Sequence, residues 1–332
     1  MYALLLSSLF SAAAIAAPSI ETVELPVNGA AEHVALNCVA PAQRTDKALL
    51  FVHGATFPTR LAFGFEFSPG DSWLHFVAKQ GYLACGVDFR GFGTSSRPAP
   101  MRAAAGAAPP QERANDAADD IAAAMQYLRT KQNIAAIHLV AHSWGTIPAA
   151  AYAARRPAGL KSLTLFGPVV PDGSTQPHEE VKDAWFFLTA QQRLEGLRFK
   201  SVLPPGKVLL ESQMETRWAA EFAASAVHEA GDAPGQMRIP NGPNADIADA
   251  EAGRYPYDQK AVDVPLFVVY GNYDTVVNDE QASQFLAKFT GTAFKWRLRI
   301  DDGTHVMHLE HQRRSLYESV AAFVRTVSER QP

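Results

Sequence analysis

Ile137-His138-Leu139-Val140-Ala141-His142-Ser143-Trp144-Gly145 joins an apolar run to an alanine-rich segment. A short apolar run that ends in a turn is typical of a buried strand, and alanine is the strongest helix former. Small residues at positions 141 and 145 allow a sharp turn between the two elements, with Ser143 at its apex. A serine hydroxyl becomes a useful nucleophile in such a place if a histidine and two backbone N–H donors lie beside it.

The motif around Ser143 departs at one position from the strict pattern Gly-x-Ser-x-Gly, because Ala141 replaces the first glycine. Alanine adds one methyl group where strand and helix approach closely, which such a turn tolerates. The short motif alone also fits an ordinary turn between a strand and a helix. Its interpretation therefore depends on the rest of the chain.

Strand-like and helix-like runs alternate along most of the chain, which is typical of a mostly parallel sheet covered by helices on both faces. The first two strand-like runs flank a segment that begins Asn28-Gly29 and predict a β-hairpin. Pro26 cannot donate a backbone hydrogen bond, so its strand is expected at the edge of the sheet. The predicted strands cover residues 22–27, 32–39, 48–52, 82–87, 137–140, 163–166, 266–270 and 294–300. The predicted helices cover residues 73–79, a segment capped by Asn115 with Ile121, Met125 and Leu128 on one face, and residues 309–328.

Short polar or glycine-containing motifs follow four other predicted strands, as the Ser143 turn follows its own. They are His53-Gly54, Asp88-Phe89-Arg90-Gly91-Phe92-Gly93-Thr94-Ser95, Gly271-Asn272-Tyr273-Asp274 and Gly303-Thr304-His305. Together and in this order, these motifs make the chain from about residue 22 to the terminal helix resemble the α/β-hydrolase superfamily. The resemblance implies an α/β fold with a mostly parallel eight-stranded sheet, helices on both faces and an inserted helical cap.

The resemblance also implies a role for each motif. Ser143 would attack a carbonyl carbon, His305 would take up and return its proton, and Asp274 would orient the imidazole. The backbone N–H groups of Ala55 and Trp144 would stabilise the oxyanion. The order Ser, Asp, His matches the superfamily, and the resemblance implies neither a cofactor nor a metal ion.

Two residues near these motifs are alternatives for their roles. Asp172 follows the strand at 163–166, where some members of the superfamily place the acid, but the context of Asp274 is closer to the usual one. His142 is adjacent to Ser143 and is expected to pack behind the turn rather than act as the base.

Other polar residues are assigned structural roles. His308 and His311 lie near Glu310 in the sequence, a grouping that suggests a metal cluster, but surface or helix-capping histidines are the simpler interpretation. Asp88 and Arg90 are expected to hold the loop after their strand.

The alternation stops between about residues 172 and 258. Here we expect helical runs that contain Trp185, Phe186, Phe187, Leu188 and Trp218, followed by a Gly/Pro/Asn-rich stretch over 231–243. Such an insertion fits a cap over an active site, although its aromatic residues could instead fill a small core of their own. The predicted organisation is a core of residues 17–171 and 259–332 with a cap at 172–258.

Three functions fit these features. The first is a carboxylic ester hydrolase that acts on a small-molecule ester, because a serine at the turn disfavours the dehalogenases and epoxide hydrolases of this fold, which use a carboxylate there. The second is an aminopeptidase similar to proline iminopeptidases, which share Ser-Trp-Gly at the turn and bind a free amine through cap carboxylates. The carboxylates that could bind the amine are Glu179, Glu180, Glu211, Glu215 and Glu221. The alternative is that these residues lie on solvent-exposed faces of helices and bind nothing. The third is a non-catalytic ligand-binding homologue.

Composition and charge restrict the partners of the chain. Its 332 residues, 47% of them hydrophobic, suffice for one large or two modest globular domains. A formal net charge of -4 offers no basic surface for nucleic acid, so nucleic-acid binding is not expected.

The N-terminus predicts export. Residues 2–17 are largely apolar and predict a signal peptide at 1–16, with Ala14-Ile15-Ala16 as the cleavage motif. The segment lacks Lys and Arg, so an apolar first strand or a mis-assigned start codon is the alternative. It is short for a membrane anchor, and a secreted or periplasmic protein without a stable membrane span is expected.

Cys38 and Cys85 are the two cysteines of the chain, and they fall in predicted strands that could be neighbours. An exported protein could oxidise them, but the geometry of adjacent strands is often wrong for a bridge. Two buried thiols are therefore expected.

Overall fold

The computed structural model of the chain describes residues 18–174, 178–212, 214–225, 229 and 231–330. The predicted signal peptide at 1–16 lies outside these residues. Within them, no helix is both long enough and apolar enough to cross a membrane.

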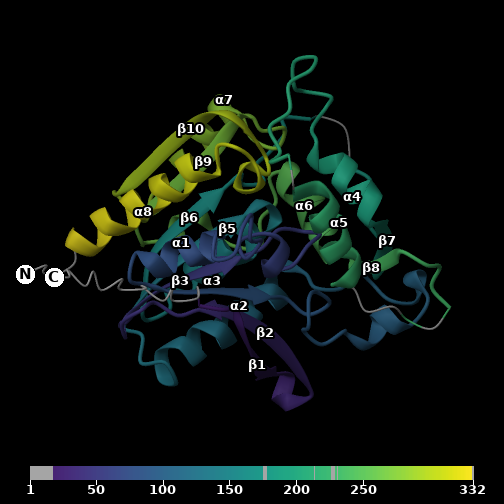
Figure 1. Cartoon of the computed structure of the whole chain (residues 1–332), viewed down its shortest axis with the longest axis horizontal. Coiled ribbons are helices and arrows are strands. Elements are labelled where there is room, and N and C mark those ends of the chain that lie inside the picture. The colour runs from purple at the N-terminus through teal and green to yellow at the C-terminus, as the bar shows by residue number, and fades with distance from the viewer. Residues whose placement is uncertain (1–17, 175–177, 213, 226–228, 230, 331–332) are drawn as a thin grey trace, which may run out of the picture.

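An eight-stranded sheet forms the centre of the molecule (Figure 1). Its strands follow the order β1-β2-β4-β3-β5-β6-β9-β10, in which β1 pairs with β2, and β2 with β4, antiparallel, while the remaining neighbours are parallel. The strands are β1 Glu21–Val27, β2 Glu32–Val39, β3 Lys47–Val52, β4 Leu83–Asp88, β5 Ala136–His142, β6 Leu160–Phe166, β9 Leu266–Tyr273 and β10 Lys295–Thr304. The predicted fold class, the opening hairpin and the edge position of Pro26 are therefore confirmed.

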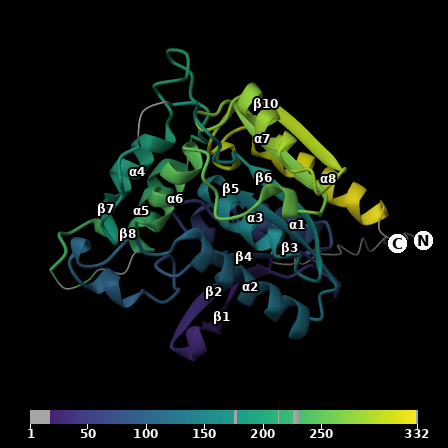
Figure 2. The same ribbon diagram turned by 180° about the vertical axis from the view of Figure 1, so that it is seen from behind.

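Helices cover both faces of the sheet (Figures 1 and 2). Helix α1 (Trp73–Lys79) lies in the crossover from β3 to β4, and α2 (Ala114–Thr130) lies in the crossover from β4 to β5. These two crossovers move across the sheet in opposite directions. Because crossovers between parallel strands are right-handed, α1 and α2 lie on opposite faces. The crossovers that contain α3 (Thr146–Ala154) and α7 (Asp279–Ala287) move across the sheet in the same direction as that of α2, so these helices share its face. Helix α8 (Arg313–Arg330) packs beside α1, where the rings of Trp73 and Tyr317 stack with their centres 4.5 Å apart.

Two helix boundaries differ from the prediction. Helix α2 begins at Ala114, one residue before the predicted cap Asn115. A residue distant in sequence stabilises its first turn, because Oδ2 of Asp246 accepts the N–H of Ala114 at 2.6 Å. Helix α8 begins at Arg313 rather than at residue 309, because Met307–Leu309 form a separate 3-10 turn. The predicted apolar face of α2 is buried.

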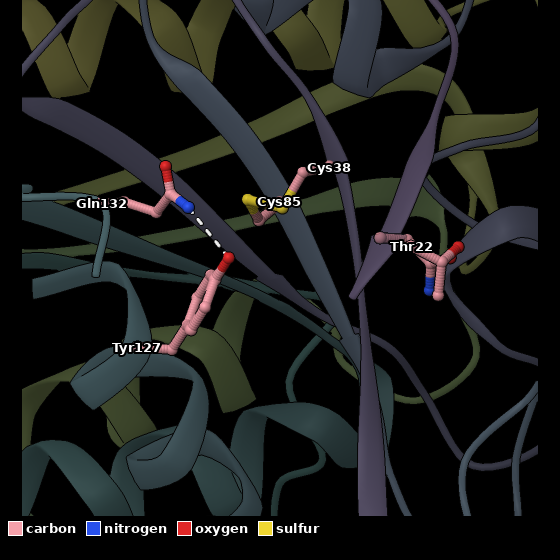
Figure 3. Close-up of a disulfide and its surroundings, with 6 residues drawn as sticks. Thr22, Cys38, Cys85, Tyr127 and Gln132 are labelled. Carbon is pink, nitrogen blue, oxygen red and sulfur yellow. Dashed lines mark hydrogen bonds between the residues drawn. A yellow bond between two sulfur atoms is a disulfide. The ribbon is translucent and has the colours of Figure 1, made fainter. Parts of the chain in front are cut away.

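Cys38 and Cys85 form a disulfide bond (Figure 3), so the expectation of two buried thiols is wrong. The two residues lie directly opposite each other in the antiparallel pairing of β2 with β4, and their Cα atoms are 4.1 Å apart. Directly opposed residues of antiparallel strands approach to about 4.5 Å between their Cα atoms where the pair is not hydrogen-bonded. The register of these two strands, which the sequence does not specify, therefore places the two sulfur atoms within bonding distance.

The described residues between β6 and β9 form a group of elements at one side of the sheet (Figures 1 and 2). The group comprises the antiparallel pair β7 (Trp185–Thr189) and β8 (Gln236–Pro240) and the helices α4 (Ala190–Leu197), α5 (Met214–Ala224) and α6 (Gly242–Glu251). We call residues 172–258 the insertion. The predicted helix over 185–188 is wrong, because these residues form a strand that pairs with β8. Alternate residues of a strand share a face, and on this one the rings of Trp185 and Phe187 lie 4.8 Å apart.

Helix α5 attaches the insertion to the loop that follows β3. Trp218 is fully buried and donates its Nε1–H to the carbonyl oxygen of Leu61 at 2.9 Å. Its ring packs edge-on against Phe57 at 5.3 Å and stacks on Phe222 at 5.1 Å. The aromatic residues of α5 therefore pack against the core as well as against each other.

Candidate active site

Ser143 lies at the turn between β5 and α3 and has a left-handed backbone, with φ of 57°. Few residues other than glycine adopt this conformation, which turns the chain sharply between a strand and a helix and exposes the side chain. Gly145 is required in the same turn because a Cβ there would collide with the carbonyl oxygens of Val52 and His53. Ala141 is fully buried in β5, so its methyl group is accommodated at the position of the first glycine of the motif.

The structure brings Ser143, His305 and Asp274 together. Nε2 of His305 lies 2.8 Å from Oγ of Ser143, and Nδ1 of His305 lies 3.0 and 3.1 Å from the two carboxylate oxygens of Asp274. Because an ionised carboxylate only accepts hydrogen bonds, Nδ1 carries the proton and Nε2 is free to accept the proton of the serine. The arrangement is the one that a general base beside a nucleophile requires.

The pair of His305 and Asp274 is enclosed by the protein. The side chain of Asp274 is fully buried, and Oδ1 also accepts the N–H of Val276 at 2.8 Å. Gly167, which follows β6 with φ of 54°, lies against the pair. A Cβ at Gly167 would lie 2.9 Å from Nδ1 of His305 and 3.0 Å from Oδ2 of Asp274. The residue at this position must therefore be small.

His142 holds the loop that carries His305. Its Nε2 lies 2.7 Å from the carbonyl oxygen of His305 and donates to it. Burial, together with the neighbouring rings of His308 and His305, lowers the pKa of His142 well below its usual value, so the ring is neutral. His142 therefore packs behind the turn as a fixed donor.

The loop after β3 approaches Ser143 closely, because a Cβ at Gly54 would lie 3.1 Å from Cβ of Ser143. His53 fixes this loop: its Nε2 accepts the N–H of Phe89 at 3.2 Å, and its Nδ1 donates to the carbonyl oxygen of Gly54 at 2.7 Å. The C=O and N–H of one peptide group point in opposite directions. The N–H of Ala55 therefore points away from His53.

The same reasoning applies to the N–H of Trp144. The carbonyl oxygen of Ser143 accepts the hydroxyl of Thr146 at 2.6 Å, on the side of α3. The N–H of Trp144 belongs to the same peptide group and points away from α3. Both predicted oxyanion donors therefore have a fixed direction.

Glu310 supports the strand end that precedes His305. It is buried, and its carboxylate accepts the N–H of Thr304 at 2.9 Å and the hydroxyl of the same residue. Burial raises the pKa of Glu310 to about 7, with a smaller contribution from the charge of Asp274, although the hydrogen bonds from Thr304 oppose this shift. A titratable carboxyl group is therefore bound to the residue that precedes His305.

Residues 47–312 match a family described as the alpha/beta hydrolase fold. The chain belongs to this family.

Solved structures of similar fold belong to proteins that are named for different activities. A thioesterase domain from the curacin biosynthetic pathway is 17% identical, with a TM-score of 0.60 over 91% of this chain and 99% of that one. A thermophilic esterase from Thermogutta terrifontis is also 17% identical, with a TM-score of 0.58 over 92% and 99% of the two chains. A bromoperoxidase from Bacillus anthracis is 18% identical, with a TM-score of 0.60 over 92% and 100%. No curated protein sequence matches the chain significantly. These similarities show the fold alone, so the chemistry of this alpha/beta hydrolase has to be argued from its own residues.

Of the two acids considered for the site, Asp274 is the one that contacts His305. In this alpha/beta hydrolase Asp172 instead accepts the N–H of Ser174 at 2.7 Å, and its other oxygen lies 3.8 Å from Nε2 of His178. The ligand atoms of Asp172, His178 and Glu251 lie within 4.8 Å of one another and could surround a cation at the surface of the insertion. Surface acids beside a histidine commonly adopt such spacing as ion pairs, without a metal.

The interpretation of His308 as a surface or capping residue is wrong. Its ring is fully buried between Phe57, Phe63, Phe166 and His142, and burial lowers its pKa to about 3. His308 is therefore part of the aromatic packing beneath the site, although it closely follows the polar motif that contains His305. His311 is exposed and lies 3.5 Å from Glu211.

Asp88 and Arg90 hold the loop after β4 in different ways: the backbone carbonyl oxygen of Asp88 accepts the hydroxyl of Ser95 at 2.6 Å, whereas its carboxylate holds β2 and the loop after β3. The carboxylate of Asp88 accepts the N–H of Thr59 at 2.7 Å and the side-chain amide of Asn37 at 2.9 Å. Arg90 donates from Nε to Asp120 at 3.2 Å.

Two residues that shape the site were not predicted. Asp246 of α6 accepts the indole N–H of Trp144 at 3.0 Å across 102 positions of sequence, and no local pattern signals such a contact. Gly167 could have been recognised, because it directly follows the strand predicted at 163–166, as the other site motifs follow theirs.

Proposed function

We propose that this alpha/beta hydrolase cleaves carboxylic esters through an acyl-enzyme intermediate on Ser143. The observation that carries the proposal is the continuous chain of contacts from Oγ of Ser143 through the imidazole of His305 to Asp274. An esterase and a thioesterase among the proteins of similar fold support the same class of reaction.

In the first half of the reaction, Ser143 Oγ attacks the ester carbonyl carbon while Nε2 of His305 takes up the hydroxyl proton. The resulting oxyanion is stabilised by the N–H groups of Ala55 and Trp144. The tetrahedral intermediate collapses, the bond to the alcohol oxygen breaks, and His305 donates its proton to the leaving alcohol.

In the second half, a water molecule attacks the acyl carbon and His305 takes up one of its protons. The bond to Ser143 Oγ breaks, the proton returns to that oxygen, and the carboxylic acid leaves. Asp274 stabilises the imidazolium that forms in each half and keeps Nδ1 as the protonated nitrogen.

The acidic residues of the insertion argue against an aminopeptidase. Glu179 is exposed. The other four carboxylates have local cationic partners: Glu180 with Lys182, Glu211 with Arg313, Glu215 with Arg198 and Glu221 with Arg217. Carboxylates that are already paired, or that lie in solvent, are poor receptors for the free amine of a peptide.

A non-catalytic ligand-binding protein is disfavoured by the contact of 2.8 Å between Oγ of Ser143 and Nε2 of His305. A binding protein has no use for a nucleophile held beside a base.

The test is turnover of p-nitrophenyl acyl esters of several chain lengths against proline and other aminoacyl naphthylamides. We expect ester turnover by the wild-type protein, loss of that turnover in Ser143→Ala, and fluorophosphonate labelling on the peptide that contains Ser143. Amide turnover that exceeds ester turnover would favour the aminopeptidase, and ester turnover that persists in Ser143→Ala would overturn the proposal.

We also propose that the protein is exported to the periplasm or the medium, through the signal peptide predicted at residues 1–16. The disulfide between Cys38 and Cys85 supports this location, because disulfides persist in oxidising compartments. Mass spectrometry of the protein produced in its own host tests the proposal, and a mature N-terminus at Ala17 is the expected result. An intact N-terminus in the cytoplasmic fraction would contradict it.

A further inference from the structure

One arginine of the insertion has no acidic partner among the residues that the structure describes, and it lies over a ring of the loop that follows β3. Arg193 is on α4, and its guanidinium carbon lies 5.4 Å from the centre of the Phe57 ring. Its Nε is buried without a hydrogen-bond partner, and no carboxylate of the described chain pairs with the guanidinium. Burial lowers the pKa of Arg193 to about 10, so the side chain is still cationic at neutral pH.

Another largely buried arginine of the protein shows what is missing at Arg193. The side chain of Arg90 is 11% exposed and contacts three carboxylates, those of Glu32, Glu112 and Asp120. A guanidinium that is removed from water loses hydration, and paired carboxylates offset that loss. Arg193 is half-buried, its Nε is removed from solvent, and no such carboxylate lies against it in the described chain.

The charge of Arg193 acts on His308 and His142, the buried histidines that pack beneath the site. Phe57, over which the guanidinium lies, follows the oxyanion residue Ala55 by two positions. After burial and the neighbouring histidine, the charge of Arg193 is the next cause that lowers the pKa of His308. The ring of His308 lies 4.6 Å from that of His142, which lies 5.0 Å from that of His305.

We propose that Arg193 binds a carboxylate group carried by the ester substrate, so that the enzyme prefers anionic esters to neutral ones. The planar guanidinium presents paired N–H donors that match a carboxylate, and the match is strongest where water is excluded. A bound carboxylate would supply the acceptor that Nε lacks in the described chain. The inference rests on the proposed function and adds the substrate class to it.

The test compares matched pairs of esters that differ in one carboxylate. Monoethyl adipate against ethyl hexanoate places the charge on the acyl side, and p-acetoxybenzoate against p-tolyl acetate places it on the alcohol side. For at least one pair, we expect kcat/KM of the wild-type enzyme to be about tenfold or more higher for the anionic ester. Arg193→Met should abolish that preference, mainly through KM, and change kcat/KM for the neutral ester less than about threefold.

Two variants separate recognition of charge from packing. Arg193→Lys keeps the charge without the planar fork and should retain part of the preference. Arg217→Met is the matched control, because Arg217 also lies over a ring, 4.6 Å from the centre of Phe65, but is paired with Glu221 at 3.2 Å. It should leave the preference unchanged.

Binding without turnover gives a second readout. Calorimetry with Ser143→Ala should detect binding of adipate that is lost when Arg193→Met is added, and inorganic phosphate in a parallel titration measures how far the site accepts another anion. Equal kcat/KM for both members of each pair, or an equal loss on charged and neutral esters in Arg193→Met, would overturn the inference. Neutral esters still cleaved in a Ser143-dependent manner would then leave the proposed function intact.

Discussion

The imidazole of His305 is positioned by groups from different parts of the chain. Asp274 contacts its Nδ1, His142 donates to its carbonyl oxygen, and Glu310 holds the preceding residue, Thr304. The sequence could predict Ser143, Asp274 and His305, because each lies in a motif that follows an apolar run. The sequence could not predict that His142 and Glu310 position the imidazole, because their roles depend on which segments meet in space.

At Asp274 we predict that Asp274→Asn lowers kcat by about 10³- to 10⁴-fold with a small change in KM. An asparagine can donate to Nδ1 and so stabilise the tautomer in which Nε2 carries the proton and cannot accept that of Ser143. Steady-state kinetics with a p-nitrophenyl ester measures the effect, and thermal unfolding reports whether the variant is folded.

Asp172→Asn is the matched control for this change, because Asp172 was the alternative acid and contacts His178 and Ser174 instead. It should keep kcat within about twofold of the wild type. A larger loss in Asp172→Asn than in Asp274→Asn would assign the acid to the other strand.

Glu310 predicts a pH dependence of stability. Its pKa is about 7 in the folded protein, above the value of about 4.3 expected in the unfolded chain, so folding takes up a proton between these pH values. The contribution of Glu310 to stability is therefore complete below about pH 4 and is lost as pH rises toward 7, by about 1.4 kcal/mol per pH unit at most.

Glu310→Gln mimics the protonated carboxyl group and should remove this loss. Urea unfolding at pH 5 and pH 8 should show the variant gaining stability relative to the wild type at the higher pH. The exposed Glu318→Gln should show no such gain. A difference between Glu310→Gln and the wild type that stays constant with pH would contradict the assignment.

At the scale of elements, the sheet was predictable and the insertion was not. Every strand of the sheet overlaps an apolar or alternating run of the sequence, and the central strands are buried as such runs predict. In contrast, the run Trp185-Phe186-Phe187-Leu188 has no period that separates strand from helix, and its conformation is set by pairing with β8. Helices α6 and α7 were missed altogether, and α6 shows almost no separation of apolar and polar faces.

The carboxylate of Asp246 joins elements that the sequence separates. Its Oδ2 accepts hydrogen bonds from the N–H of Ala114, at the start of α2, and from the indole N–H of Trp144. Its Oδ1 accepts a hydrogen bond of 2.5 Å from Nε of Arg113. We predict that Asp246→Ala lowers the free energy of unfolding by about 2–4 kcal/mol, because buried donors lose their acceptor.

Chemical denaturation measures this loss, and Asp249→Ala is the control. Asp249 also contacts Arg113, at 2.7 Å, but its side chain is 37% exposed, so its removal should cost less than about 1 kcal/mol. Equal losses in the two variants would mean that the ion pair with Arg113, and not the bonds to Ala114 and Trp144, stabilises the junction.

At the scale of the whole molecule, the disulfide ties the antiparallel edge of the sheet to its parallel part, since β2 belongs to the first and β4 to the second. The bridge spans 47 positions of sequence. Cross-linking a loop of this length restricts the unfolded chain, so Cys38→Ser should destabilise the protein by about 2–4 kcal/mol.

Unfolding in urea with and without dithiothreitol checks the prediction. The reductant should lower the stability of the wild type to that of Cys38→Ser and leave the variant unchanged. Two titratable thiols in the untreated, unfolded wild type would contradict the bridge.

Because the chain holds a single pair of cysteines, only one intramolecular bridge can form. Oxidative maturation of this protein therefore needs a thiol oxidant but no isomerase to reshuffle mispaired bonds. In the export that we propose, both sulfur atoms would leave the translocation channel before Ser143, so the first hairpin and β4 could be cross-linked while the remainder of the chain is still being synthesised.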